Sequence, residues 1–265
     1  MKDWIDPTGD LINSIGENGF ASTLVGALRK VAQFDYAVVF GYLGTNRPLD
    51  LFDNFPAKKR KIFVEDYQEG PYLLDPFYLA TTTPISPGIY RLREIAPDRF
   101  YQGEYFRNYY EQTGLAEEIG FLVGLSGGAT AVISLMRTNK PFTAKEIREL
   151  RQFWPIVRAS VQQHWNDLPA QISGGTDGQT KAKIGASVER AFLHFGGGIL
   201  TPREREVVEF TLKGHSADAV GKILGIASGT VRIHRKNIYS KLRIGSQGEL
   251  FSRFIATLSD SRNDS

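Results

Sequence analysis

Residues 230–242 read TVRIHRKNIYSKL, and this stretch decides the architecture of the last quarter of the chain. It carries four Lys and Arg side chains and no carboxylate. On a helix with 3.6 residues per turn, one apolar stripe is formed by Val231, His234, Ile238 and Leu242. We expect this stripe to be buried and the cations to face outward. Alone, the pattern fits either a solvated basic helix or a helix that lies against a polyanion.

The residues before this stretch favour the second interpretation. In LTPREREVVEFTLKG, Thr201 and Glu204 form a capping-box pattern and Gly214 ends the helix. A second short helix is predicted from Ser216, followed by a tight turn that contains glycine. Residues 247–258 predict a fourth helix. The C-terminal domain is therefore predicted to be an all-α, four-helix helix-turn-helix domain, with residues 230–242 as the second helix of that motif.

A helix at this place in the motif enters the major groove of DNA. Arg232, Ile233 and Lys236 share an outward face, where Arg and Lys reach the acceptors of base edges. The flanking cations Arg235 and Lys241 suit phosphates, as does Thr230 near the helix N-terminus. The sequence thus predicts a DNA-binding surface made of Thr230, Arg232, Ile233, Arg235, Lys236 and Lys241.

Residues 200–250 are similar to the DNA-binding domain of the LuxR (NarL/FixJ-type) transcription regulators. The resemblance rests on motifs spread over the whole segment, namely Leu200-Thr201, Glu206-Val207, Gly225-Ile226, Thr230-Val231, Lys241-Leu242 and Glu249-Leu250. It implies that Arg232, Ile233 and Lys236 read bases and that Thr230, Arg235 and Lys241 contact the DNA backbone. It also implies a homodimer formed through the last helix, with RNA polymerase as a candidate further partner. Ala227 stands where the family usually has a capping Ser.

Composition and charge agree with a DNA partner. Residues 196–265 carry a net charge of +4, whereas the rest of the chain carries −1, and such asymmetry indicates a polyanion partner for the basic part. The chain has no cysteine, which excludes disulfides, thiolate metal sites and a cysteine nucleophile. Apolar runs stay short of the roughly 18 residues that a membrane span needs, and the N-terminus lacks the pattern of a signal peptide. We therefore expect a cytoplasmic protein without a membrane partner.

A chain of 265 residues is long enough for two domains. Residues 168–187 are rich in Gly, Ser, Thr and Gln and predict a linker. It separates an effector-sensing domain, residues 1–167, from the DNA-binding domain, residues 188–265. The first domain alternates helical patterns with strands such as YAVVFGYL, and Thr143 begins a long capped helix. This order predicts an α+β fold, an α-β-α sandwich with an antiparallel sheet of the GAF/PAS type.

The sensing domain lacks the acidic pattern of a phosphorylated receiver. Its segment FVEDYQEGPYLLDPFYLATTTPISPGIY instead resembles the acyl-homoserine lactone receptors in an aromatic, a Tyr, an Asp-Pro pair and a later aromatic. The resemblance implies a ligand site that contains Phe63, Tyr67, Asp75, Tyr90 and Ser134. Lactone receptors usually have Trp where Phe63 and Tyr90 stand, and the indole N–H binds the lactone ring. We therefore expect another small-molecule effector, with a lactone as the alternative.

Other interpretations stay open for these residues. Asp75 followed by Pro76 is also a common helix start, and aromatic side chains at helical spacing often belong to a core. An aromatic cage with one carboxylate suits a cationic amine as well as a lactone amide. The four histidines lack metal-ligand spacing, and Ser126 between glycines is better explained by a hairpin turn than by a nucleophile elbow. We therefore predict no catalytic site, cofactor or metal, with an enzyme or a protein-interaction domain fused to the DNA-binding module as alternatives.

Overall fold

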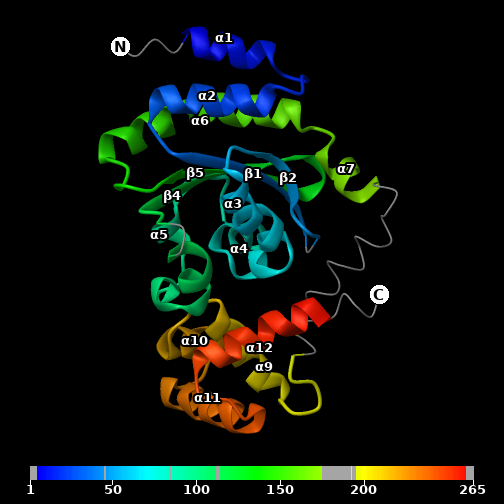
Figure 1. The fold of residues 1–265 in the computed structure, drawn as a ribbon, viewed down its shortest axis with the longest axis vertical. Coiled ribbons are helices and arrows are strands. Elements are labelled where there is room, and N and C mark those ends of the chain that lie inside the picture. The colour runs from blue at the N-terminus through cyan, green and yellow to red at the C-terminus, as the bar shows by residue number, and fades with distance from the viewer. Residues whose placement is uncertain are drawn as a thin grey trace.

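The computed structural model describes residues 5–44, 46–83, 85–111, 114–174, 192 and 195–260. An α/β part forms the N-terminal half of the molecule, and a smaller helical part follows below it (Figure 1). No helix in the described ranges is long and apolar enough to cross a membrane.

A five-stranded antiparallel sheet organises the N-terminal part. Its strands, in spatial order, are β2 (Leu49–Asp53), β1 (Tyr36–Leu43), β5 (Ala129–Arg137), β4 (Glu117–Gly124) and β3 (Gly88–Arg91). The hairpin between β4 and β5 turns at Gly127 and Gly128, which both have positive φ angles. Ser126 begins the short 3₁₀ turn η6 (Ser126–Gly128) in this connection, so the predicted hairpin is confirmed.

Three helices lie on one side of the sheet, two of them against the strands and the first packed outside those two (Figure 1). They are α1 (Ile5–Asn13), α2 (Phe20–Val31) and α6 (Ala144–His164). α6 begins with the predicted capping box, in which the Glu146 N–H donates to Thr143 Oγ1 and the Thr143 N–H donates to Glu146 Oε2. Ala37 and Val39 of β1 are buried beneath these helices, because alternate strand residues point to opposite faces.

Short helices cover the opposite face. These are α3 (Ala57–Arg60), η1 (Lys61–Asp66), η2 (Pro71–Leu74), α4 (Pro76–Thr82), α5 (Leu92–Ile95), η3 (Phe100–Gln102) and η4 (Phe106–Tyr110). Two of them, η1 and η4, are π-helices, a rare conformation that is frequent at functional sites. The two helical layers around an antiparallel sheet confirm the predicted α-β-α sandwich.

The linker predicted at residues 168–187 begins before the end of the α/β fold. Residues Leu168–Gly174 form helix α7, and Leu168 is fully buried in the core on the α1, α2 and α6 side of the sheet. Its Cδ2 lies 2.8 Å from the position that a Cβ on Gly41 of β1 would occupy. Residues 168–174 are therefore part of the α/β fold, while the remainder of the predicted linker, 175–187, lies outside the described residues.

The C-terminal part consists of the four predicted helices. They are α9 (Pro202–Leu212), α10 (Ala217–Leu224), α11 (Ser228–Leu242) and α12 (Gln247–Asp260). The capping box of α9 forms as predicted, Ser216 caps α10, and Gly225 ends α10 with a φ of 66°. Figure 1 shows α12 on the side that faces the sheet and α11 at the far end of the molecule.

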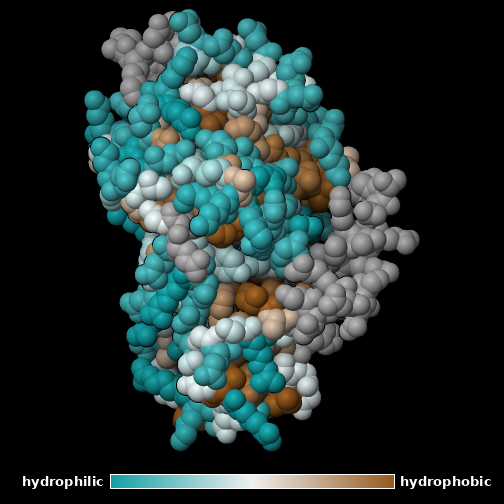
Figure 2. Space-filling model, in the orientation of Figure 1, coloured by the Kyte–Doolittle hydropathy of each residue, from teal (hydrophilic) through white to brown (hydrophobic). Residues whose placement is uncertain are grey.

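The two parts meet through specific contacts. The Arg99 N–H donates to Gly214 O at 3.0 Å, and the Ser216 N–H donates to Asp98 Oδ1 at 2.9 Å. Leu258 of α12 packs against Gly70, with its Cδ1 2.7 Å from where a Cβ on Gly70 would stand. Hydrophobic side chains are visible where the two parts meet, although most of the face shown in Figure 2 is hydrophilic.

Candidate DNA-binding and ligand-binding sites

The outward face of α11 carries the residues that the sequence assigns to base reading. Arg232, Ile233 and Lys236 are all exposed, and Ile233 has 60% of its surface exposed. On the inner side Val231, Ile238 and Leu242 are buried and His234 is half-buried. The helix thus presents two cations and one apolar side chain to solvent at the end of the molecule away from the sheet, where a DNA groove can reach them.

The N-terminus of α11 differs slightly from the prediction. Ala227 is the N-cap residue, no side chain caps it, and Ser228 is the first helical residue. Thr230 is exposed in the first turn. A helix end that no side chain caps leaves backbone N–H groups for an anion such as a DNA phosphate.

Two predicted phosphate contacts have partners inside the domain. Arg235 Nε donates to Thr211 Oγ1 at 3.1 Å, and its Nη2 donates to His215 O at 3.0 Å. Lys241 Nζ donates to Glu204 Oε2 at 2.7 Å. Burial alone would raise the pKa of Glu204, but the bonds from Lys241 and Thr201 lower it overall. Arg235 and Lys241 therefore hold α11 to α9 and the turn after it, and their contact with phosphates stays a prediction.

A small chamber lies between the sheet and the layer of short helices that includes η1 and η4. Its volume is about 30 Å³. Its walls consist of Val38, Phe40, Tyr42, Ile62, Phe63, Tyr67, Asp75, Phe77, Tyr105, Tyr109, Tyr110, Glu118, Ser134 and Met136. Ser134 occupies the centre of the floor, since it pairs with Val38 on one side and Gly120 on the other. Gly120 admits the ring of Phe77, whose nearest atom lies 2.2 Å from where a Cβ would stand.

Asp75 has two functions in the structure. Its Oδ1 accepts from the Phe77 N–H at 2.8 Å and caps α4. Its Oδ2 accepts from the Tyr67 hydroxyl at 2.7 Å, and the Tyr67 and Tyr42 hydroxyls lie 2.7 Å apart. Burial raises the pKa of Asp75 to about 6 against the lowering effect of these hydrogen bonds. The helix-start interpretation of Asp75 is thus confirmed, and the same carboxylate also lines the chamber.

Glu118 of β4 brings a second carboxylate that the sequence did not identify. The residue is 3% exposed. Ser134 and Tyr110 hydrogen-bond to it, but its Oε2 has no hydrogen-bond partner among the described residues. Burial, and then the nearby charge of Asp75, raise the pKa of Glu118 to about 8. The available signal was a pair of acidic residues, Glu117 and Glu118, that opens an otherwise apolar strand, because one of two adjacent strand residues must point to each face.

The structure brings Phe63, Tyr67, Asp75 and Ser134 together but separates Tyr90 from them. Tyr90 lies on the edge strand β3, and its hydroxyl donates to Ser86 O at 2.7 Å. It does not line the chamber, so the structure does not bring it together with the other four, and its contact with a ligand stays a prediction. The chamber residues that the sequence missed are Tyr42, Tyr105, Tyr109, Tyr110 and Glu118.

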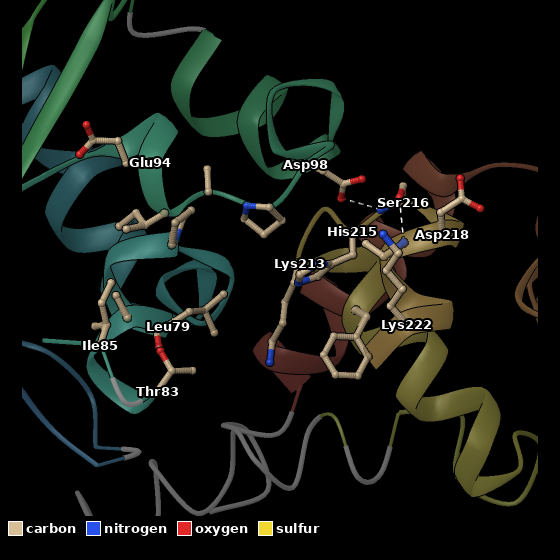
Figure 3. Close-up of a pocket in the computed structure, with 17 residues that line it drawn as sticks. Leu79, Thr83, Ile85, Glu94, Asp98, Lys213, His215, Ser216, Asp218 and Lys222 are labelled. Atoms are coloured by element: carbon tan, nitrogen blue, oxygen red, sulfur yellow. Dashed lines mark hydrogen bonds between the residues drawn. The ribbon is translucent and has the colours of Figure 1, made fainter. Parts of the chain in front are cut away.

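A larger cleft of about 720 Å³ lies between the two parts of the molecule (Figure 3). Leu79, Thr83, Ile85 and Glu94 line it from the α/β part, whereas Lys213, His215 and Lys222 line it from the helical part. The hydrogen bond between Asp98 and Ser216 closes one side of this cleft (Figure 3). The described residues contain no group of three or more His, Asp or Glu side chains placed to hold a metal ion.

Comparison with known proteins agrees with this architecture. Residues 198–254 match the family described as bacterial regulatory proteins, luxR family. The chain is also 34% identical, over 183 residues, to an HTH-type transcriptional regulator from the exeN 3' region of Aeromonas salmonicida, and the match covers 68% of this chain and 93% of that protein. The chain belongs to the LuxR family. This LuxR-family member is therefore a transcriptional regulator with α11 as the second helix of its helix-turn-helix motif.

Two further similar proteins each cover part of this LuxR-family chain. The transcriptional regulatory protein MctR of Rhizobium johnstonii is 39% identical over 119 residues, which cover 44% of this chain and 53% of that protein. The crystal structure of the VqsR LBD domain from Pseudomonas aeruginosa superposes with a TM-score of 0.53 at 25% identity. It covers 61% of this chain and 95% of that domain.

Proposed function

We propose that this regulator senses a small molecule other than an ordinary acyl-homoserine lactone, and that the ligand occupies the chamber. The observation that carries the proposal is the burial of Asp75 and Glu118 in one aromatic chamber. An acyl-homoserine lactone offers one amide N–H donor, and its remaining polar atoms are acceptors. It would donate to only one of the two carboxyl groups and bring no positive charge to either. The similarity to the VqsR LBD domain supports a ligand-binding role for this part of the chain.

The proposal for DNA rests on α11. Arg232, Ile233 and Lys236 would read base edges, Thr230 would contact phosphate at the helix N-terminus, and Arg235 and Lys241 would contribute to the backbone contacts while they hold the helix in place. A homodimer would match a two-fold symmetric operator. RNA polymerase is a further proposed partner, and the cytoplasm is the proposed location because the DNA lies there.

Dimerisation through α12 would use its exposed side. Leu250, Phe254 and Leu258 are buried within the chain, while Arg253 and Ala256 are exposed. Leu258 packs against Gly70 of the α/β part, and Phe254 packs against Phe195 of the helical part, so a dimer formed through these residues would first require α12 to leave both neighbours. Sedimentation velocity with and without ligand distinguishes the two arrangements, because undocking increases the frictional ratio before dimers form.

Ligand binding is tested by thermal unfolding of the full chain with a panel of lactones, amines, organic acids and alcohols. A ligand at 100 times its Kd should stabilise the protein by about 2.7 kcal/mol. Ser134→Leu fills the floor of the chamber and should abolish the shift, while DNA binding, measured with operators selected from a random DNA pool, is retained. A response to lactones alone would overturn the proposed ligand class. If no compound in the panel shifts the unfolding temperature, a protein-interaction domain is favoured instead.

A further inference from the structure

The described wall of the chamber has acidic side chains but no basic ones. It contains two buried carboxylates and no Lys, Arg or His side chain. Both oxygens of Asp75 have donors, from Tyr67 and from the Phe77 backbone. Glu118 Oε2 is buried, and none of the residues that the structure describes donates to it. Buried polar atoms in proteins are nearly always hydrogen-bonded, so an orphan of this kind needs a partner such as a water, an ion or a ligand.

The walls indicate which chemistry would complete the site. Tyr42, Tyr67, Tyr105, Tyr109 and Tyr110 surround the carboxylates with aromatic rings, whose faces attract cations. An anion would be repelled by either acid once that acid is ionised. A neutral ligand made mainly of carbonyl groups would accept a hydrogen bond only from protonated Glu118 and would bring no positive charge to the two carboxyl groups. An ammonium group supplies N–H donors and positive charge at the same point.

We propose that the chamber binds an organic cation through an ammonium group, with Glu118 as its principal counter-ion and Asp75 as the second carboxylate. The inference rests on the proposed ligand-sensing function and names the ligand class of that site. The Tyr67 hydroxyl holds Asp75 in place, so Glu118 is the carboxylate with an oxygen free to accept from the ligand.

The cavities also indicate the shape of the ligand. The chamber, at about 30 Å³, has room for one small polar group. A neighbouring cavity of about 320 Å³ is lined by Leu92, Phe106 and Leu115 and shares Glu118 and Tyr110 with the chamber. Displacement of the Tyr110 ring, at the end of π-helix η4, would join the two cavities. The ligand class is therefore an amine with an apolar tail.

Binding should be linked to protons. The titratable groups that face Glu118 from the surrounding elements are Tyr42, Tyr67, Asp75, Tyr105, Tyr109 and Tyr110 on the chamber side and Arg93, Tyr101 and Glu117 on the side of the larger cavity. Because the pKa of Glu118 is raised to about 8, the carboxyl must lose its proton when it binds an ammonium group near neutral pH. Amine affinity should therefore rise with pH up to about 8, by at most about tenfold per pH unit.

Isothermal titration of the full chain provides the test. The probes are hexylamine and phenethylamine, with hexanol, N-acetylhexylamine and hexanoyl-homoserine lactone as uncharged controls. We expect the amines to bind, with proton release detected as a dependence of the heat on the ionisation enthalpy of the buffer. Glu118→Gln should weaken amine binding by roughly a hundredfold. Glu65→Gln removes an exposed carboxylate that pairs with Arg60 and should leave the affinity unchanged.

The outcomes separate the ligand class from ligand sensing itself. If an uncharged probe binds more tightly than its matching amine, or if Glu118→Gln binds amines as wild type does, the cation inference is wrong while small-molecule sensing stands. If no probe of any class binds, the proposal of ligand sensing in the chamber and the cation inference are both wrong. The melting temperature and DNA binding of Glu118→Gln show whether the variant is folded.

Discussion

The backbone N–H of Ser216 donates a hydrogen bond to the carboxylate of Asp98 at 2.9 Å and thereby joins the start of α10 to a loop of the sensing domain. The next residue in that loop, Arg99, bonds to Gly214 through its backbone N–H. Phe100 follows, and its ring lies 6.0 Å from that of Tyr105 and 5.8 Å from that of Tyr110, centroid to centroid. Residues 98–110 therefore contact both the aromatic chamber and the helix-turn-helix.

Asp98→Ala should loosen the docking of the two parts. The change removes the acceptor for Ser216, and a hydrogen bond of this kind contributes about 0.5–1.5 kcal/mol. We expect faster amide hydrogen exchange at the start of α10, around Ser216, as measured by mass spectrometry. Asp98→Asn keeps an acceptor oxygen and should retain most of the protection. Equal exchange in wild type and Asp98→Ala would show that this contact does not hold the domains together.

Replacement of the exposed cations of α11 should reduce specific DNA binding. Arg232→Ala and Lys236→Ala should each cost about 1–3 kcal/mol if the side chain reads a base. Fluorescence anisotropy with the selected operator and a scrambled duplex measures the loss and the specificity ratio. Arg158→Ala removes an exposed cation on α6 of the sensing domain and serves as the control. The groove assignment is wrong if the double variant of α11 still discriminates the two duplexes as wild type does.

Lys241→Met tests whether this lysine is structural. The change leaves the buried Glu204 carboxylate without its cation, and we expect a loss of about 1–2 kcal/mol in the free energy of unfolding by urea, because Lys241 is partly exposed. The pKa of Glu204 is lowered in the folded state, so this contribution is present above its ordinary pKa and disappears as the pH falls through the folded value. A lysine that only contacts phosphate predicts unchanged stability at every pH.

The helix-turn-helix was predictable because its signals are local. Thr201 with Glu204, Ser216 and Gly225 each mark a helix boundary within a few residues, and the structure has all of these boundaries. The linker was harder, because composition describes residues 168–174 as polar and small on average. Leu168 is buried against Gly41, which is far away in the sequence. Local composition gives no information about such a contact.

The ligand chamber was predictable only where one segment supplies it. Tyr67 and Asp75 flank the short helices η1 and α4 and are close in sequence, but Glu118 comes from strand β4 and was missed. Tyr90 lies outside the chamber for a different reason. It pairs with Gly120, which pairs with Ser134, so Tyr90 and Ser134 lie in one row across the sheet. The ring of Phe77 packs on Gly120 between them, and a motif spacing along the chain cannot show that a third side chain fills the intervening space.

Glu118→Gln should stabilise the free protein at pH 8. Burial and the charge of Asp75 raise the pKa of Glu118 from 4.5 to about 8 in the folded state. Between these values the folded chain keeps the Glu118 proton and the unfolded chain releases it, so stability falls as the pH rises through this range. Glutamine has nearly the same shape and no proton to lose. The variant should gain on the order of 3 kcal/mol over wild type at pH 8, and this difference should shrink towards pH 5.

Urea unfolding of both proteins between pH 5 and pH 8 measures this difference. Glu65→Gln, at an exposed position, should follow the wild-type curve throughout. A variant that gains stability while it loses amine affinity would show that Glu118 is kept at a cost to the free protein, which is the usual relation between a binding site and the stability of its fold. Parallel curves for wild type and Glu118→Gln would instead mean that Glu118 ionises near its ordinary pKa, and that the Glu118 carboxylate is already solvated or paired in the free protein.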